Sequence, residues 1–163
     1  MSDLSQPTLA GFKTWITYQG IPDGALPDDS PVIPVAYNVS KALVNQWLAT
    51  VPSPDIALPS IYALTVYNLA MDRVANYAPN PENGPLYPGT DLPYWDGFRA
   101  ATNLYGFVGG IISSASDNGT SQSMVTPEQM TNMTMDDLQT LKTRWGRTYM
   151  GFAQMFGVDW GIS

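Results

Sequence analysis

Five prolines and two glycines fall within residues 79–96, and this stretch constrains the fold more than any other feature. Proline lacks the N–H that helices and central strands need, and it disfavours a helical conformation in the residue before it. We therefore predict a long Pro-rich loop on the surface of one domain, held in place by Tyr87, Tyr94 and Trp95. A short helix is expected to follow at about residues 98–104.

Before this loop, three segments have apolar residues at helical spacing. Residues 8–18 predict a first short helix. Ser30 and Pro31 predict the start of a second, because serine is a good N-cap and proline suits the first helical position. Ser60 is expected to cap a third helix that runs to about residue 78 and is apolar on nearly all sides, as buried helices are. The core stripe expected for the second helix consists of Val32, Ala36, Val39, Leu43 and Trp47.

The strongest helical pattern lies in residues 134–156. Thr134 and Asp137 form a capping-box pattern at its start, with aspartate in the place of the usual glutamate. Apolar and aromatic residues then recur on one side of the predicted helix, a stripe of Leu138, Leu141, Trp145, Tyr149, Phe152 and Phe156. Such an aromatic stripe is more typical of core packing than of a cofactor site.

Residues 111–125 differ from the rest, because Ser and Thr surround an Asn118-Gly119 pair. Asn-Gly adopts the positive φ values of a type I′ turn at little cost, so the segment predicts a two-stranded hairpin. Its flanks hold too few apolar residues to pack on both faces, so we expect the hairpin to project and to pair with another chain. The alternative is an irregular surface loop.

Together, these segments predict a mainly α fold in a single domain, residues 1–163. About four helices are expected to form a helical bundle from residues 8–78 and 134–156. The β-hairpin is expected to be inserted between them as a projection, after the long Pro-rich loop.

Side chains that usually carry catalysis near neutral pH are scarce, since the chain has no histidine, no cysteine and two glutamates. Their loss removes the commonest proton shuttle, the most reactive nucleophile and the usual zinc ligands. The aspartate pairs Asp28-Asp29 and Asp136-Asp137 precede expected helix starts, where helix capping explains them. No nucleotide-binding loop or nucleophile elbow is present. We therefore expect no catalytic activity, no cofactor and no metal site.

Charged residues make up 13% of the chain, against about 25% in typical soluble domains. We expect neighbouring subunits to cover this low-charge surface; the alternative is a composition tolerated by its lineage. The net charge of -7 argues against broad contact with nucleic acid. Residues 138–163 carry a net charge of +2 and residues 1–137 carry -9, which permits head-to-tail association of copies. The alternative is that the positive charge of residues 138–163 belongs to a helix face exposed to solvent and takes no part in association.

The tail, residues 158–163, lies beyond the last predicted helix and is a candidate anchor on another subunit. Asp72 and Arg73 are expected to form an ion pair that orients neighbouring elements. Arg144 and Arg147 are expected to pair with acidic neighbours through bidentate contacts. The candidate partner-docking residues are Trp160, Ile162, Asn118, Gly119, Arg144 and Arg147.

Residues 1–11 contain neither a basic segment nor an apolar one, so no signal peptide is expected. The longest apolar run, residues 61–69, is too short to span a bilayer. We therefore expect a protein that is made and used in a cytoplasm, with no membrane partner.

Four segments resemble landmarks of tailed-bacteriophage neck proteins, the head-to-tail adaptors or connectors. They are LPDDSPVI at residues 26–33, YALTVYNLA at 62–70, FVGGIISS at 107–114 and LKTRWGRTY at 141–149. The similarity covers most of residues 10–163. Its motifs are structural and carry no reaction signature.

The resemblance implies a helical bundle with an inserted hairpin that forms a ring, often twelve-fold, beneath the portal protein. It further implies a virion protein of the neck, assembled in the host cytoplasm, with sister subunits, the portal and a tail or nozzle protein as partners. Genomic DNA would pass through the channel without specific binding, which the acidic net charge suits. The alternatives are another phage ring protein, such as a tail terminator or tail completion protein, and an aspartate-based virion hydrolase. The hydrolase would need two acids that converge in a cleft.

Overall fold

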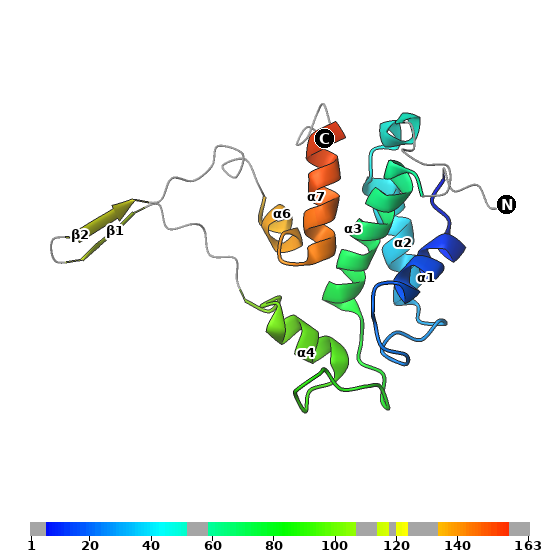
Figure 1. Ribbon diagram of the computed structural model, residues 1–163, viewed down its shortest axis with the longest axis horizontal. Helices are drawn as coiled ribbons and strands as arrows, with labels where there is room; N and C mark the ends of the chain where they lie inside the picture. Colours follow the sequence, from blue (N-terminus) through cyan, green and yellow to red (C-terminus); the bar gives the residue numbers. More distant parts are fainter. Residues whose placement is uncertain (1–5, 52–58, 107–113, 118–119, 124–133, 157–163) are drawn as a thin grey trace.

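The computed structural model describes residues 6–51, 59–106, 114–117, 120–123 and 134–156. This part is mainly helical, as the sequence predicted (Figure 1). The α-helices are α1 (Leu9–Thr17), α2 (Val32–Leu43), α3 (Ile61–Tyr77), α4 (Tyr94–Ala101), α6 (Met135–Thr140) and α7 (Arg144–Phe156), with a 3₁₀ helix η1 (Gln46–Thr50) and strands β1 (Ser114–Asp117) and β2 (Thr120–Ser123).

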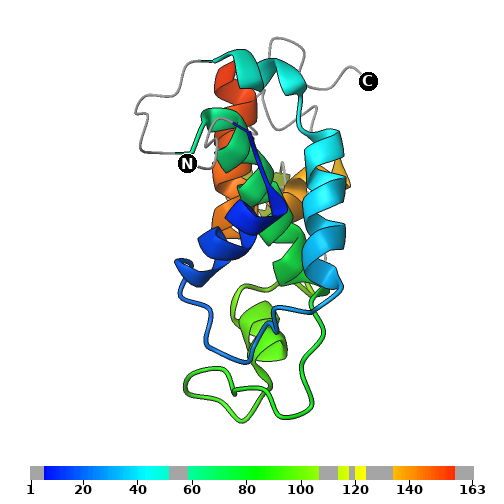
Figure 2. The same ribbon diagram turned by 90° about the vertical axis from the view of Figure 1, so that its right-hand side faces the viewer.

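Helix α3 is the central element of the helical core. Helix α2 packs along one side of it, α7 packs along another, and α1 lies across α2 and α3 (Figures 1 and 2). Twelve of the seventeen residues of α3 are buried, as predicted for a helix that is apolar on nearly all sides. The predicted cap is also confirmed, since Ser60 Oγ accepts a hydrogen bond of 3.1 Å from the N–H of Ala63.

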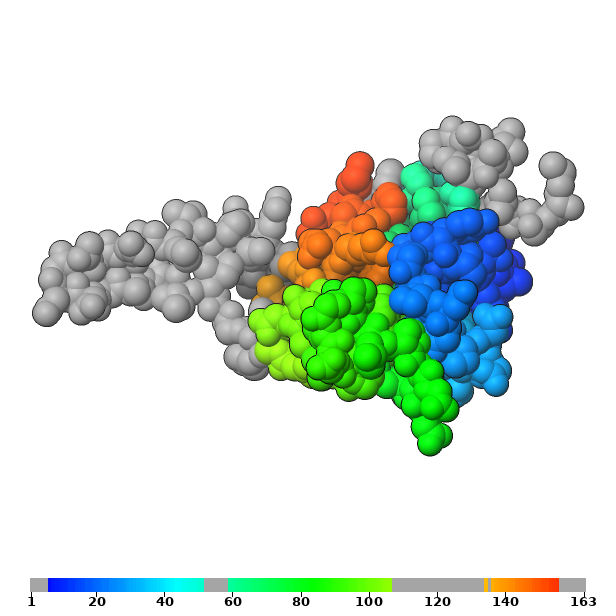
Figure 3. Space-filling model, turned by 60° about the horizontal axis from the view of Figure 1, so that its bottom comes forward, coloured from blue at the N-terminus to red at the C-terminus, as the bar shows by residue number. Residues whose placement is uncertain are grey.

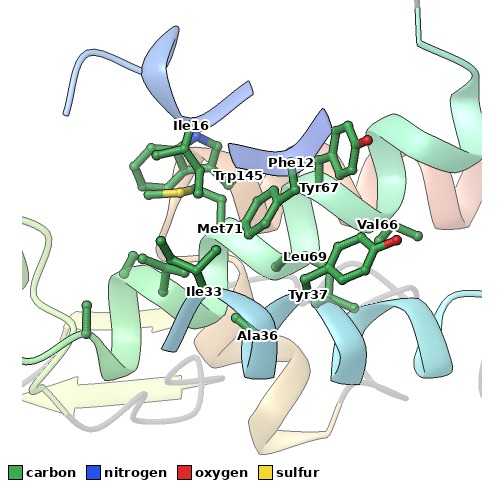
Figure 4. Packing of buried hydrophobic residues seen from close by; sticks show 14 of the residues in the cluster. Phe12, Ile16, Ile33, Ala36, Tyr37, Val66, Tyr67, Leu69, Met71 and Trp145 are labelled. Atoms are coloured by element: carbon green, nitrogen blue, oxygen red, sulfur yellow. The ribbon is translucent and has the colours of Figure 1, made fainter. Parts of the chain in front are cut away.

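An aromatic cluster joins α1, α2 and α3 (Figure 4). Phe12 of α1 is fully buried, and its ring centroid lies 6.1 Å from that of Tyr37 in α2 and 5.6 Å from that of Tyr67 in α3. The Tyr37 hydroxyl donates to the carbonyl of Pro7 at 2.7 Å, and the Tyr67 hydroxyl donates to that of Thr8 at 3.2 Å. Each tyrosine therefore buries its ring and still satisfies its polar tip, which ties the start of α1 to α2 and α3.

Helix α4 begins inside the range predicted as loop. The expected loop 79–96 ends at Pro93, and the helix expected at 98–104 runs instead over Tyr94–Ala101. Trp95 explains the shift, because its fully buried indole donates to the carbonyl of Ala25 at 2.7 Å. On the face shown in Figure 3, the loop and α4 (green) lie beside both α7 (orange) and the N-terminal segments (blue).

Helix α2 is rotated relative to the prediction. Its buried residues are Ile33, Ala36, Tyr37 and Ser40, a stripe displaced by about one position from the expected one. Ser30 makes no side-chain cap, because Pro31 takes the N-cap position. The helix ends at Leu43, so the expected stripe residue Trp47 lies in η1 and is half exposed.

The expected helix 134–156 is two helices. The capping box at its start is confirmed, with Thr134 Oγ1 accepting from the N–H of Asp137 and the Asp137 carboxylate accepting from the N–H of Thr134. The chain then turns, and Thr143 Oγ1 accepts from the N–H of Gly146 at 2.8 Å as α7 begins. Trp145 is buried, as predicted. Leu138, Leu141, Tyr149 and Phe152 are partly buried, whereas Met150 and Ala153 of α7 are buried.

Strands β1 and β2 pair antiparallel, with Ser114 opposite Ser123 and Asp117 opposite Thr120. The predicted turn residues Asn118 and Gly119 lie between them, outside the described residues. Among the helices that the structure describes, none is long and apolar enough to cross a membrane.

Candidate interaction surface

Of the six predicted docking residues, the structure describes two. Arg144 and Arg147 lie on the exposed side of α7. Trp160 and Ile162 of the tail and the turn pair Asn118-Gly119 are outside the described residues. The docking role of those four residues therefore stays a prediction.

Among the described residues, Arg144 and Arg147 donate to backbone carbonyls, and their expected bidentate pairing with acids stays a prediction. Arg144 Nη2 donates to the carbonyl of Gln19 at 2.5 Å, and its guanidinium lies 4.5 Å from the Trp145 ring centroid. Arg147 Nη1 donates to the carbonyls of Leu141 and Lys142, at 3.1 and 3.3 Å. The carbonyls of Leu141 and Lys142 follow the end of α6, where helical partners are missing, so Arg147 caps that end. Arg144 instead fixes α7 to the segment after α1.

The two aspartate pairs differ in their relation to helix starts. Asp137 caps α6, as predicted, with Asp136 beside it in the first turn. Asp28 and Asp29 do not cap α2, whose first turn contains no acid. Across the described ranges, no three acidic residues come together as a possible metal site.

One hollow of about 300 Å³, near the start of α2, does bring two aspartates into a single lining. Asp23 and Asp28 both line it, together with Lys13, whose Nζ donates to the carbonyl of Asp28 at 2.5 Å. Nearby apolar residues complete the lining. This hollow therefore brings two carboxyl-bearing residues to one surface depression.

Asp72 is buried where α3 meets the start of α7. Its carboxylate accepts a hydrogen bond of 2.5 Å from Thr143 Oγ1, a residue 71 positions away. Burial raises the pKa of Asp72 from 3.8 to about 6, while the Thr143 hydrogen bond and the Arg73 charge lower this pKa and the Asp136 charge raises it. The expected Asp72–Arg73 ion pair is therefore replaced by an aspartate–threonine contact, since no ion pair of either residue occurs among the described residues.

We expect the free energy of unfolding to fall as the pH rises from about 4 to 6. The folded carboxyl of Asp72 keeps its proton up to about pH 6, whereas the unfolded one releases it near 3.8. Above pH 6 the cost approaches about 3 kcal/mol. Asp72→Asn should remove this cost, because an amide oxygen still accepts from Thr143. Urea unfolding between pH 4 and 8 measures the difference between the two chains.

The exposed Asp29→Asn is the matched control, since it changes the net charge equally. It should leave the pH dependence of the parent unchanged. If the free energy of unfolding changed with pH in the same way in the parent and in Asp72→Asn, the prediction would be contradicted. Asp72 would then ionise as readily in the folded chain as in the unfolded one.

An apolar groove of about 360 Å³ lies between α2 and α3. Arg73 supplies the only charge in its lining, and the Nε of Arg73 is buried without a hydrogen-bond partner in the described chain. Tyr77 at its edge is 71% exposed. The lining of this α2–α3 groove is Pro31, Val32, Val35, Ala36, Val39, Arg73 and Tyr77.

Two lining residues of the groove also belong to a set of exposed apolar side chains on α2 and η1, which we name the α2 ridge. It consists of Val35, Val39, Leu43 and Trp47. The first three are four residues apart on one helix and so share a face. Val35 is 61% exposed and Trp47 50% exposed. Three of the four belong to the stripe that the sequence assigned to the core, so sequence reasoning found these residues and missed their exposure.

Comparison of the chain with protein families, curated proteins and solved structures finds no match. The α2 ridge and the α2–α3 groove are therefore interpreted from their own geometry.

Proposed function

We propose that this chain is a structural protein of the tailed-bacteriophage neck, a head-to-tail adaptor. Its copies form a ring between the portal and the tail, and the ring continues the DNA channel. The partners are sister subunits, the portal protein and a tail or nozzle protein, and the chain acts without catalysis or a cofactor. It works in the virion, after assembly in the host cytoplasm.

The observation that carries this proposal is the exposed α2 ridge beside the α2–α3 groove. The domain has a buried core without these side chains, in which Phe12, Trp95 and Met71 are fully buried. Contiguous apolar surface on a protein typically marks a contact with another molecule. A ring subunit needs such a surface, because each copy meets two neighbours.

Composition supports the same reading. A chain with 13% charged residues has few charges to keep its surface soluble, and neighbouring subunits would cover that surface. The net charge of -7 suits a channel that repels DNA and lets it pass. In this proposal the helices form a four-helix bundle, and the β1–β2 pair projects from it to meet a sister subunit or the portal.

There are two alternative functions: a ring at another position in the virion, and a hydrolase. A tail terminator or tail completion ring would use the same apolar surface, and its place at the tail end of virions in electron micrographs would identify it. A hydrolase would use Asp23 and Asp28 in their shared hollow. Cleavage of peptidoglycan or polysaccharide that is lost in Asp28→Asn would favour the hydrolase over the adaptor.

We expect Val35→Asp to abolish ring formation, because it places a charge in the middle of the apolar contact surface. Val35 is exposed in the subunit, so the variant should keep the helical circular dichroism and melting temperature of the parent. The measurement is native mass spectrometry and electron microscopy of the chain with its portal.

Gln154→Asp is the control, since it adds the same charge on the exposed side of α7. It should assemble like the parent. Normal rings from Val35→Asp would place the subunit contact elsewhere and remove the main support for the proposed function.

A further inference from the structure

We propose that the α2–α3 groove of one copy binds the tail of a second copy, with Trp160 in the apolar groove and Asp159 paired with Arg73. This inference rests on the self-association in the proposed function and names the contact that produces it. It does not depend on the position of the ring in a virion.

The groove defines the chemistry of its occupant. Its volume of about 360 Å³ is at the lower end of ligand pockets, which range over roughly 300–1,000 Å³, so it takes a large side chain and little more. Every lining residue except Arg73 is apolar or aromatic. An aromatic group is therefore the best fit.

Arg73 adds a second requirement. Its Nε is buried without a hydrogen-bond partner, and no described carboxylate lies within ion-pair distance of its guanidinium. A buried donor without an acceptor is costly, and a carboxylate is the acceptor that a guanidinium binds best. The occupant should thus carry an acid next to its aromatic group.

Only two places in the chain have aspartate beside tryptophan. At Trp95-Asp96 the indole is fully buried, and Asp96 pairs with Arg99 at 3.6 Å. The other is Asp159-Trp160, in the tail that follows α7. The tail therefore combines the two groups that the groove requires.

The path from the end of α7 back to the groove of the same subunit is long, which favours a second copy as the acceptor. Thr143 contacts Asp72, so the start of α7 is level with Arg73 at one end of the groove. The thirteen residues of α7 then rise about 20 Å away from that level. Trp160 follows Phe156 by four residues, which span at most about 14 Å. The groove also opens on the α2 side of α3, whereas α7 packs on another side (Figure 1).

A contact between different surfaces of two identical chains is heterologous. Each copy gives a tail and accepts one, so the contact repeats from copy to copy, and it forms a ring when the rotation between neighbours closes. The acidic tail residue and the groove arginine set the direction of this association.

The test is a photo-crosslink from position 160 in the full chain, with p-benzoylphenylalanine in place of Trp160. Copies labelled with ¹⁵N are mixed with unlabelled copies up to millimolar concentration, and cross-linked peptides are identified by mass spectrometry. We expect links from position 160 to residues 31–39 or 73–77, about half of them between a labelled and an unlabelled chain. Val35→Asp should remove these links, and Gln154→Asp should retain them.

A second measurement uses the natural tail. Trp160→Ala should weaken self-association in sedimentation by about thirtyfold or more, as loss of a central interface tryptophan does. Its melting temperature should equal that of the parent, because the inference places Trp160 at a contact between copies and not in the subunit's own core.

The outcomes separate this inference from the proposed function. Rings that form while position 160 links to other residues, to the portal or to its own chain overturn the tail-in-groove contact and leave the ring role standing. Links to the groove in a chain absent from virion necks support the contact and overturn the adaptor role. A chain without links between copies at millimolar concentration overturns the inference.

Discussion

Trp95→Ala should lower the free energy of unfolding by about 4 kcal/mol. The indole of Trp95 is fully buried, its Nε1 donates to the carbonyl of Ala25 at 2.7 Å, and its ring lies 5.1 Å from that of Tyr94 and 6.1 Å from that of Phe98. Alanine would leave a large cavity and an unpaired carbonyl, so both losses add. Urea unfolding followed by circular dichroism measures the change.

Trp47→Ala is the matched control for this prediction. It removes the same side chain from η1, where the indole is half exposed and belongs to the α2 ridge. We expect a change in the free energy of unfolding of about 0.5 kcal/mol, as at most surface sites. Equal destabilisation by the two variants would contradict the placement of Trp95 in the core and Trp47 at the surface.

Gly146→Ala should destabilise the chain by about 3 kcal/mol, although alanine is a better helix former than glycine. A Cβ at this position would overlap the backbone carbonyl of Thr140, because the chain turns tightly between α6 and α7. A backbone atom cannot move aside as a side chain can, so the two helices would have to separate. Thermal and urea unfolding give the magnitude.

Gly151→Ala provides the opposite expectation in the same helix. A Cβ on Gly151 would meet no atom within 4 Å, so alanine should stabilise α7 by up to about 1 kcal/mol. The sign of the difference between the two variants is therefore the test. Stabilisation by both would mean that α6 and α7 form one continuous helix, as the sequence pattern first predicted.

Local sequence signals predicted most of the helices. The capping side chains of Ser60 and Thr134 act on N–H groups three residues away, so a short stretch of sequence contains the whole interaction. The apolar residues on nearly all sides of α3 likewise predicted its burial, since such a helix has almost no polar face to turn to solvent.

The break between α6 and α7 depends on contacts that no local pattern contains. Thr143 begins α7 with its hydroxyl, and the same hydroxyl donates to Asp72 in α3. The apolar spacing across the break continues well enough to resemble one helix. Only the packing of α3 against α7 shows where the chain must turn.

The sequence determined which residues of α2 are apolar, and the tertiary structure decided which of them are buried. Helix α2 has apolar side chains on two adjacent stripes, and a helical repeat alone cannot choose between them. The choice follows from shape, because Ile33, Ala36 and Tyr37 fit against α1 and α3. Val35 and Val39 are left exposed in the lining of the α2–α3 groove, so the surface proposed for assembly results from packing between helices distant in sequence.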